Sequence, residues 1–231
     1  ETEASIHVAR QRALGIWIEA EASRRDVLVH LPAGRLTLEA SSGSGGDPWS
    51  LRHPDLLVRP RDRIGIAGPN GSGKSTLVRR LLQGCDLDPA RQVVVPQEIG
   101  ADEAGRILDS VKTLGRAELG SMMAVISHLG SDPRRLLDSV LPSPGELRKL
   151  LLALGVARVP HLIVMDEPTN HLDLPSIECL ESALRDCPCA LLLVSHDERF
   201  LDALTSRRGE TRAEASRSYA LSATERRPIG G

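Results

Sequence analysis

The chain has 231 residues, of which 29 are basic and 31 acidic, and its formal net charge is −2. A chain of this length forms one large domain, or one domain with a small insertion. Because the positive and negative charges nearly balance, no overall electrostatic field attracts the protein to nucleic acid. No apolar run is long enough to cross a bilayer, and no signal-peptide pattern opens the sequence. We therefore expect a cytoplasmic protein with no membrane segment of its own.

Aromatic residues and cysteines are few, which limits the composition of the hydrophobic core and the kinds of metal or disulfide site that the chain can form. Aromatic residues make up 2% of the sequence, so the core must consist mainly of Leu, Val, Ile and Ala. The four cysteines lack the spacing of a zinc site or of a disulfide framework, and Cys187 and Cys189 form a C-x-C rather than a C-x-x-C pair. We expect buried free thiols in a reducing cytosol.

The first third of the chain shows short apolar stretches separated by turn residues. Residues 1–12 are polar and alanine-rich, and we predict that they form the end of a helix entering from upstream. Serines, glycines and a proline at 41–48 predict a flexible turn. Strands are predicted at 16–18, 35–38, 49–59 and 63–67.

Beyond residue 68 the pattern alternates between helices and strands. Helices are predicted at 74–82, 146–157 and 174–185, and strands at 93–95, 161–165 and 190–194. Residues 101–141 are helical in pattern, with breaks at Gly115, Gly130 and Pro133. This alternation predicts an α/β domain with a largely parallel sheet and an all-helical insertion at 101–145. Beyond about residue 207 the sequence is polar without periodicity, which predicts a weak hairpin or disorder.

A glycine-rich segment between a predicted strand and a predicted helix fits the phosphate-binding pattern G-x-x-x-x-G-K-[ST]. Glycines allow backbone N–H groups to surround a β-phosphate, and the helix N-terminus adds unpaired donors. Lys74 can reach the β- and γ-phosphates, and the Ser75 hydroxyl can bind Mg²⁺. The residues expected to hold the nucleotide are Gly68, Asn70, Gly71, Ser72, Gly73, Lys74, Ser75 and Thr76.

Two carboxylates end the apolar strand at 161–165. Ligands of a parallel sheet lie beyond the carboxyl ends of its strands, where Asp166 and Glu167 emerge. Neighbouring residues on a strand point in different directions, so we expect different roles for them. Asp166 is predicted to hold Mg²⁺ through water, and Glu167 to polarise the water that attacks the γ-phosphate.

Two further polar residues follow predicted strands. Gln97 comes after the strand at 93–95 and could bind Mg²⁺ or the attacking water. His196 follows the strand at 190–194 and could contact the γ-phosphate. Taken alone, either residue fits a solvated loop position better.

Taken in order, these features resemble the ABC ATPase superfamily over residues 15–205. The segment Asp166-Glu167-Pro168-Thr169-Asn170-His171-Leu172-Asp173 looks like the ABC-F branch, whose members are soluble proteins with two fused ATPase domains. Many of them act on ribosomes, and some protect against antibiotics. The resemblance implies a P-loop NTPase fold of the ABC type, with a largely parallel core sheet, a small antiparallel β part and a short helical subdomain at about 101–145.

The resemblance also implies the domain organisation. The ATPase domain is expected at 13–207, as the C-terminal of two such domains. Residues 1–12 are then the end of a linker helix, and 208–231 a weakly ordered tail.

In this family two domains stack head to tail, and each ATP lies between the phosphate loop of one domain and the signature sequence of the other. The signature pattern is Leu-Ser-Gly-Gly-Glu. Ser143, Gly145 and Glu146 match it, whereas Pro144 replaces the first glycine. Because proline lacks an N–H group, we expect this signature to hold the partner's ATP less well. The implied partners are a second ABC ATPase domain and a ribosome, and the implied cofactors are ATP and Mg²⁺.

Two alternatives remain open from the sequence. Membrane-transporter ATP-binding subunits share every catalytic motif, although Asn170-His171 argues against them. Pro144 and the lack of an aromatic residue between Trp17 and Trp49 to stack on adenine also fit a module that binds nucleotide but hydrolyses little. A transmembrane partner would favour the first alternative, and absent turnover in the two-domain protein would favour the second.

Overall fold

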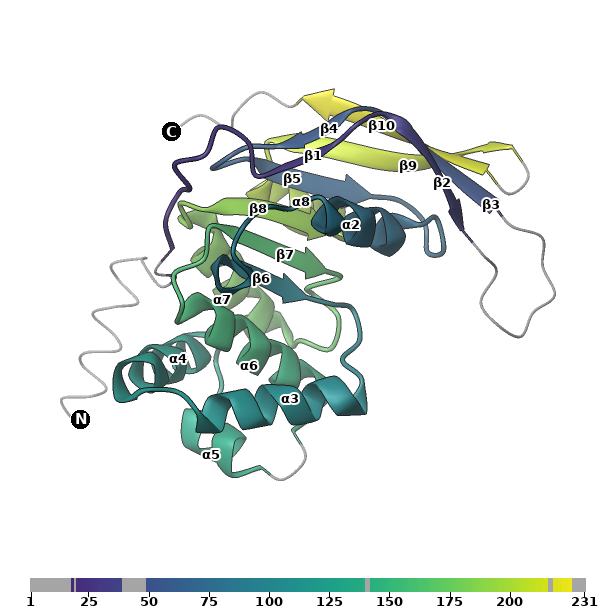
Figure 1. Ribbon diagram of the computed structural model, residues 1–231. Helices are drawn as coiled ribbons and strands as arrows, with labels where there is room; N and C mark the ends of the chain where they lie inside the picture. Colours follow the sequence, from purple (N-terminus) through teal and green to yellow (C-terminus); the bar gives the residue numbers. More distant parts are fainter. Residues whose placement is uncertain (1–17, 19, 39–48, 140–141, 216–217, 226–231) are drawn as a thin grey trace. The chain divides into compact units, whose positions relative to one another are not determined.

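The computed structural model describes residues 18, 20–38, 49–139, 142–215 and 218–225 (Figure 1). The chain forms two compact units that interleave along the sequence. The first, here called the helix-rich unit, comprises Glu1–Ala22, Asp88–Val164 and Thr169–Cys189. The second, the sheet unit, comprises Ser23–Leu87, Met165–Pro168 and Ala190–Gly231. The linker expected at 1–12 lies outside the described residues, and the domain limits at 13–207 stay a prediction.

In the sheet unit, six strands form one sheet in the order β2-β3-β10-β9-β5-β8. Strand β5 runs parallel to β8 and to β9, as predicted for the core of an α/β domain. A separate antiparallel pair joins β1 to β4. The elements are β1 (Val29–Leu31), β2 (Gly34–Leu38), β3 (Trp49–His53), β4 (Leu56–Val58), β5 (Arg63–Ala67), α2 (Lys74–Gln83), β8 (Ala190–Val194), α8 (Glu198–Leu204), β9 (Arg207–Ala215) and β10 (Ser218–Glu225).

The helix-rich unit is built around α6, which packs against α4, α3 and strand β6. Its close approach to β6 depends on Gly155, where an added Cβ would lie 2.4 Å from Val93 Cγ2. Strands β6 and β7 are neighbours. The elements are the 3-10 turn η1 (Pro89–Arg91), β6 (Gln92–Val95), α3 (Ala101–Lys112), α4 (Arg116–His128), α5 (Pro133–Asp138), α6 (Pro144–Val156), β7 (Leu162–Asp166) and α7 (Leu174–Arg185).

Most predicted elements are confirmed, several to the residue. Strands β5 and β8 and helix α7 have the predicted bounds. The predicted helix breaks are also confirmed, since Gly115 caps α4 and α5 begins at Pro133. The strand predicted at 49–59 is divided between β3 and β4, because Pro54 has no N–H to donate to a ladder. The strand predicted at 16–18 falls almost wholly outside the described residues.

The C-terminal region forms a long antiparallel hairpin of β9 and β10 (Figure 1). The sequence predicted a weak hairpin or disorder here, and the structure places this hairpin inside the sheet, between β3 and β5. The residues that it buries include Thr211 and Leu221, and Gly209 lies against Leu221. Such small or isolated buried residues leave no apolar periodicity in the sequence.

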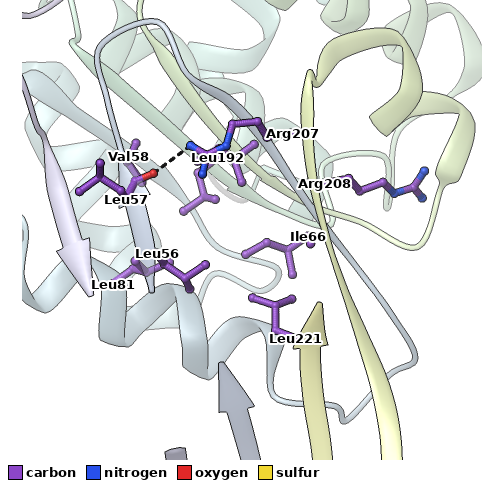
Figure 2. A pocket seen from close by; sticks show the side chains of 11 residues that line it. Leu56, Leu57, Val58, Ile66, Leu81, Leu192, Arg207, Arg208 and Leu221 are labelled. Atoms are coloured by element: carbon purple, nitrogen blue, oxygen red, sulfur yellow. Dashed lines mark hydrogen bonds between the residues drawn. The ribbon is translucent and has the colours of Figure 1, made fainter. Parts of the chain in front are cut away.

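An apolar cavity of about 90 Å³ lies within the sheet unit, between α2 and the sheet (Figure 2). Leucine and isoleucine side chains from β4, β5, β8, β10 and α2 line it. Arg207 also lines the cavity, and its guanidinium donates hydrogen bonds to Leu57 O (3.1 Å) and to Asp62 Oδ2 (2.8 Å). Arg208 also lines the cavity, and its Nη1 donates to Asp202 Oδ1 (2.7 Å), so both charged groups at the cavity are paired and the other lining residues are apolar.

None of the four cysteines forms a disulfide in the part of the chain that the structure describes. Cys187 and Cys189 are buried with their Sγ atoms 3.1 Å apart, whereas Cys85 and Cys179 are only half-buried, although all four were expected to be buried. Across the described ranges, no three His, Cys, Asp or Glu side chains gather in a metal-binding group. None of the helices that the structure describes is both long and apolar enough to cross a membrane.

Candidate nucleotide-binding site

The phosphate loop connects the end of β5 to the first turn of α2. Its glycines Gly68, Gly71 and Gly73 have φ values of 142°, 77° and 89°, which residues with side chains rarely adopt. Gly73 occupies the N-cap position of α2 in a left-handed conformation, and no side chain at this position bonds to the first N–H groups of the helix. The first N–H groups of α2 are therefore available to an anion, as the sequence motif requires.

Lys74 lies in this loop with only 6% of its surface exposed. Its Nζ donates hydrogen bonds to Gly68 O (2.8 Å) and Pro69 O (2.9 Å). Burial lowers the pKa of the Lys74 ammonium, and the negative charges of Glu167 and Asp166 partly offset this effect. The ammonium is thus held beside the loop by two carbonyl groups that a phosphate could replace.

Glu167 is buried directly after β7 and has a left-handed φ of 48°. Its N–H donates to Val194 O at the end of β8 (2.8 Å). Its Oε2 lies 2.8 Å from His196 Nδ1 and accepts a hydrogen bond from Ser195 Oγ at 3.3 Å. Ser195 is fully buried, whereas 60% of the His196 side chain is exposed. The end of β8 therefore fixes both the backbone and the carboxylate of Glu167.

Asp166 and Ser75 provide the oxygen atoms expected for Mg²⁺. Asp166 is the last residue of β7 and only 8% exposed, while Ser75 is half-buried in the first turn of α2. Asp166 lies close enough to Lys74 for its charge to raise the lysine's pKa. Carboxylate and hydroxyl oxygens beside a phosphate loop suit Mg²⁺, so these residues fit the ion. Gln97 is exposed in a bend after β6, in the helix-rich unit, and its role as a ligand stays a prediction.

The signature residues form a capped helix start in the helix-rich unit. Ser143 Oγ accepts from Glu146 N–H (3.3 Å), and the Glu146 carboxylate accepts from Ser143 N–H (2.7 Å). This capping box lowers the pKa of Glu146. Pro144 occupies the first helical position, where its missing N–H costs no intrahelical bond. The proline therefore fits the helix, and it removes one donor from the end that faces solvent.

Residues 169–173, which follow Pro168, pack against the start of α6. His171 has a left-handed φ of 62°, and its carbonyl oxygen lies so near Gly145 that an added Cβ would be 2.5 Å away. Arg148 Nη1 donates to Asn170 O at 3.3 Å. Asp173 caps α7 by accepting from Ser176 N–H (3.2 Å). Residues 169–173, the part of the ABC-F-like segment that belongs to the helix-rich unit, thus pack on the signature helix.

Comparisons with known proteins identify the family of the chain. No family model matches the chain. It is 38% identical over 162 residues to the ATP-binding protein Uup of Caulobacter vibrioides, covering 66% of this chain and 26% of that protein. It is 33% identical over 159 residues to elongation factor 3 of Zygosaccharomyces rouxii, covering 66% and 15%.

A third relative decides the family. The zinc import ATP-binding protein ZnuC of Paracoccus denitrificans is 34% identical over 176 residues, which cover 69% of this chain and 68% of ZnuC. The chain belongs to the ABC ATPase family. This ABC ATPase domain also matches a solved structure described as ribosome-bound archaeal Pelota and ABCE1, with a TM-score of 0.64 and 24% identity over 88% of this chain and 35% of that one. That likeness confirms the predicted fold.

As an ABC ATPase, the domain binds ATP with Mg²⁺ and hydrolyses it. Its relatives Uup and elongation factor 3 are of the ABC-F type, as the motifs predicted. The chain spans only 26% of the Caulobacter Uup and 15% of the elongation factor 3 that it matches.

The sequence did not identify two side chains that hold the ABC ATPase site together. Ser195 anchors Glu167, and Thr211 on β9 forms a hydroxyl pair with Ser72 (Oγ–Oγ1 2.7 Å). Ser72 was expected to contact the nucleotide, but its side chain is fully buried against Thr211. Only its backbone can face a phosphate. Ser195 could have been suspected from its place beside His196, whereas nothing near Thr211 in the sequence indicates its role.

Proposed function

We propose that this ATPase domain works as one half of a head-to-tail pair in the cytoplasm, and that closure of the pair acts on the ribosome or protects it against an antibiotic. One observation carries the proposal: the segment Asp166–Asp173 reads Asp-Glu-Pro-Thr-Asn-His-Leu-Asp. The relatives Uup and elongation factor 3 support it, the second by a name that refers to protein synthesis.

Within this proposal the sheet unit supplies the catalytic groups. Lys74 would exchange its hydrogen bonds to the carbonyl groups of Gly68 and Pro69 for the β- and γ-phosphates, and Ser75 and Asp166 would hold Mg²⁺. When bound, the ion would offset the negative charge of the phosphates. Glu167 orients the attacking water, because its carboxylate is fixed by Ser195 and His196 and needs no rearrangement to do so.

His196 has the role of a γ-phosphate contact. Its Nδ1 is engaged by Glu167 Oε2, and most of its ring is exposed, so a second ring nitrogen remains for a ligand. One imidazole can then connect the carboxylate to a phosphate oxygen. Gln97 and Thr76 complete the set expected to contact Mg²⁺ and the nucleotide.

The signature start of α6 has the role of covering the partner domain's ATP. The Ser143 hydroxyl accepts from Glu146 N–H, which leaves its proton to donate to a γ-phosphate. Gly145 N–H adds a backbone donor, whereas Pro144 provides none. We therefore assign to this signature a composite site that turns over slowly, and to the phosphate loop of this chain an unimpaired one.

The experiment uses the full-length protein with Glu167→Gln, which should stall after binding ATP. Ribosome co-sedimentation is measured with ATP and with ADP. We expect more ribosome-bound protein with ATP, and we expect the double variant Lys74→Ala/Glu167→Gln to lose that difference. Equal co-sedimentation with both nucleotides would reject the ribosome role.

A second candidate is the ATP-binding subunit of a membrane transporter. It is favoured by the match to ZnuC, which covers two thirds of that protein as well as of this chain. Affinity purification of the tagged full-length protein from detergent-solubilised membranes separates the two candidates. A stoichiometric transmembrane subunit in the eluate supports the transporter role, and its absence together with ATP-dependent ribosome binding supports the ABC-F role.

A further inference from the structure

Thr211 of β9 lies against the phosphate loop although it is 136 or more residues away in the sequence from residues 68–75. The side chain is buried, with 1% of its surface exposed. Its Oγ1 donates to Ala67 O (3.1 Å), the last carbonyl group of β5. Because a hydroxyl has one proton, the 2.7 Å contact with Ser72 must then be a donation from Ser72 Oγ to Thr211 Oγ1.

The approach of Thr211 explains why residue 68 is a glycine. A Cβ added to Gly68 would lie 1.7 Å from Thr211 Oγ1 and 2.9 Å from Thr211 O. The side chain and the backbone of Thr211 therefore both lie so close to the loop that only a glycine fits at position 68. Gly68 is required here by a neighbouring strand as well as by its φ of 142°.

The position of Thr211 follows from the register of the sheet. Strand β9 runs parallel to β5, with Glu210 opposite Ala67. Thr211 thus comes one residue later, where β5 has ended and the loop begins. On its other side Thr211 pairs with Leu221 of β10, which is also buried. The C-terminal hairpin consequently supports the phosphate loop, and the Thr211 hydroxyl joins the hairpin to the loop.

We propose that Thr211 is a positioning residue for the phosphate loop. Its hydroxyl fixes the carbonyl group before the loop and the side chain in the middle of it, so that the intervening amides point inward before a nucleotide binds. Such pre-organisation raises the affinity for nucleotide, because the loop loses less conformational freedom when the nucleotide binds. The proposal rests on the assignment of residues 68–76 to phosphate binding.

The test compares Thr211→Val, which keeps the shape but loses the hydroxyl, with Thr211→Ser, which keeps the hydroxyl. Affinity for MgADP is measured by titration calorimetry on the full-length protein, alongside the unfolding midpoint without nucleotide. We expect Thr211→Val, which removes both hydrogen bonds of the Thr211 hydroxyl, to weaken MgADP binding about tenfold, and Thr211→Ser to stay within about twofold.

Thr205→Val serves as the matched control for general loss of stability. Thr205 is a buried threonine of the same unit whose Oγ1 donates to Leu201 O (2.7 Å) rather than to the loop. Both valine variants should lower the unfolding midpoint, but only Thr211→Val should weaken MgADP. Equal losses of MgADP affinity in the two variants, or none in Thr211→Val, would overturn the proposal.

Two more variants show whether a negative result contradicts the role of Thr211 or the assignment of the phosphate loop. Ser72→Ala combined with Thr211→Val should weaken MgADP no more than Thr211→Val alone, since one shared hydrogen bond is lost in both; fully additive losses would contradict the shared role. Lys74→Ala tests the loop assignment itself. If Lys74→Ala abolishes binding while Thr211→Val binds normally, only the positioning role fails. If Lys74→Ala binds normally, the assignment of the loop fails, and the positioning role with it.

Discussion

His196 Nδ1 lies 2.8 Å from Glu167 Oε2, so the histidine that follows β8 holds the carboxylate that follows β7. The contact is reinforced at the same oxygen by Ser195 Oγ and by the backbone N–H of His196. Three donors on one carboxylate oxygen leave its orientation little freedom. This arrangement fixes the carboxylate that we propose to orient the attacking water, before any nucleotide is present.

Glu167→Gln should bind MgATP with near-normal affinity and hydrolyse it at least about a hundredfold more slowly, because an amide polarises water poorly. Phosphate release and MgATP affinity are measured on the two-domain protein, in which a composite site can form. Ser195→Ala should cause a smaller loss, since it removes one support and leaves the carboxylate. A normal hydrolysis rate in Glu167→Gln would show that another group orients the water.

Lys74→Ala should abolish the stabilisation that MgATP confers. Binding to the folded state alone adds about 2.7 kcal/mol to the free energy of unfolding at a hundredfold excess over Kd. Thermal unfolding with and without MgATP measures this difference. Lys149→Ala is the control, because Lys149 is another partly buried lysine with a pKa lowered by burial, and it bonds to Ser131 and Ser176 in the helix-rich unit. The control should be less stable but still gain from MgATP.

Gly145→Ala should destabilise the protein by about 2 kcal/mol, because the new methyl group meets the backbone carbonyl of His171. Gly105→Ala should do the opposite. Gly105 is an exposed glycine in α3 with no atom within 4 Å of an added Cβ, so alanine gains up to about 1 kcal/mol of helix propensity. Denaturant unfolding measures both. Equal effects of the two substitutions would mean that α6 and the 170–171 segment are not in close contact.

Leu221→Ala should cost about 3 kcal/mol of unfolding free energy, because it enlarges the cavity of about 90 Å³ in the sheet unit. Leu174→Ala, at a side chain that is 62% exposed, should change the stability by less than about 0.5 kcal/mol. Urea unfolding is suitable for both. A loss below about 1 kcal/mol for Leu221→Ala would show that the C-terminal hairpin contributes little to the core.

Acid should weaken the signature capping box. The backbone N–H of Ser143 holds the pKa of Glu146 below its ordinary value of 4.5, so protonation of Glu146 costs folding free energy. Its contribution is complete above about pH 4.5 and is lost as the pH falls through the lowered pKa. Glu146→Gln keeps an acceptor but cannot titrate. We expect its unfolding midpoint to fall less than that of the parent protein between about pH 6 and pH 3; parallel curves would contradict this.

The sequence predicted the elements that carry strong local signals. Buried strands such as β5 and β8 are nearly continuous apolar runs, and the phosphate loop has fixed chemistry, so both could be placed to the residue. The three-residue strand β1 was missed, because its pairing with β4 leaves no pattern of its own.

Long-range pairing explains what else the sequence did not reveal. The strand β9 is polar, and Thr211 contacts the loop only because β9 aligns with β5 in the sheet. The burial of the Ser72 side chain follows from the same alignment. The residue that stacks on adenine stays unassigned, because the Trp17 and Trp49 side chains lie outside the described residues.

The interleaving of the two units has a mechanical consequence. The chain leaves the helix-rich unit after Val164 and returns to it at Thr169, so Met165–Pro168 is a four-residue bridge that carries both acidic groups. The main chain therefore connects Asp166, the last residue of β7, and Glu167 directly to Asn170 and His171, whose carbonyl groups lie against α6.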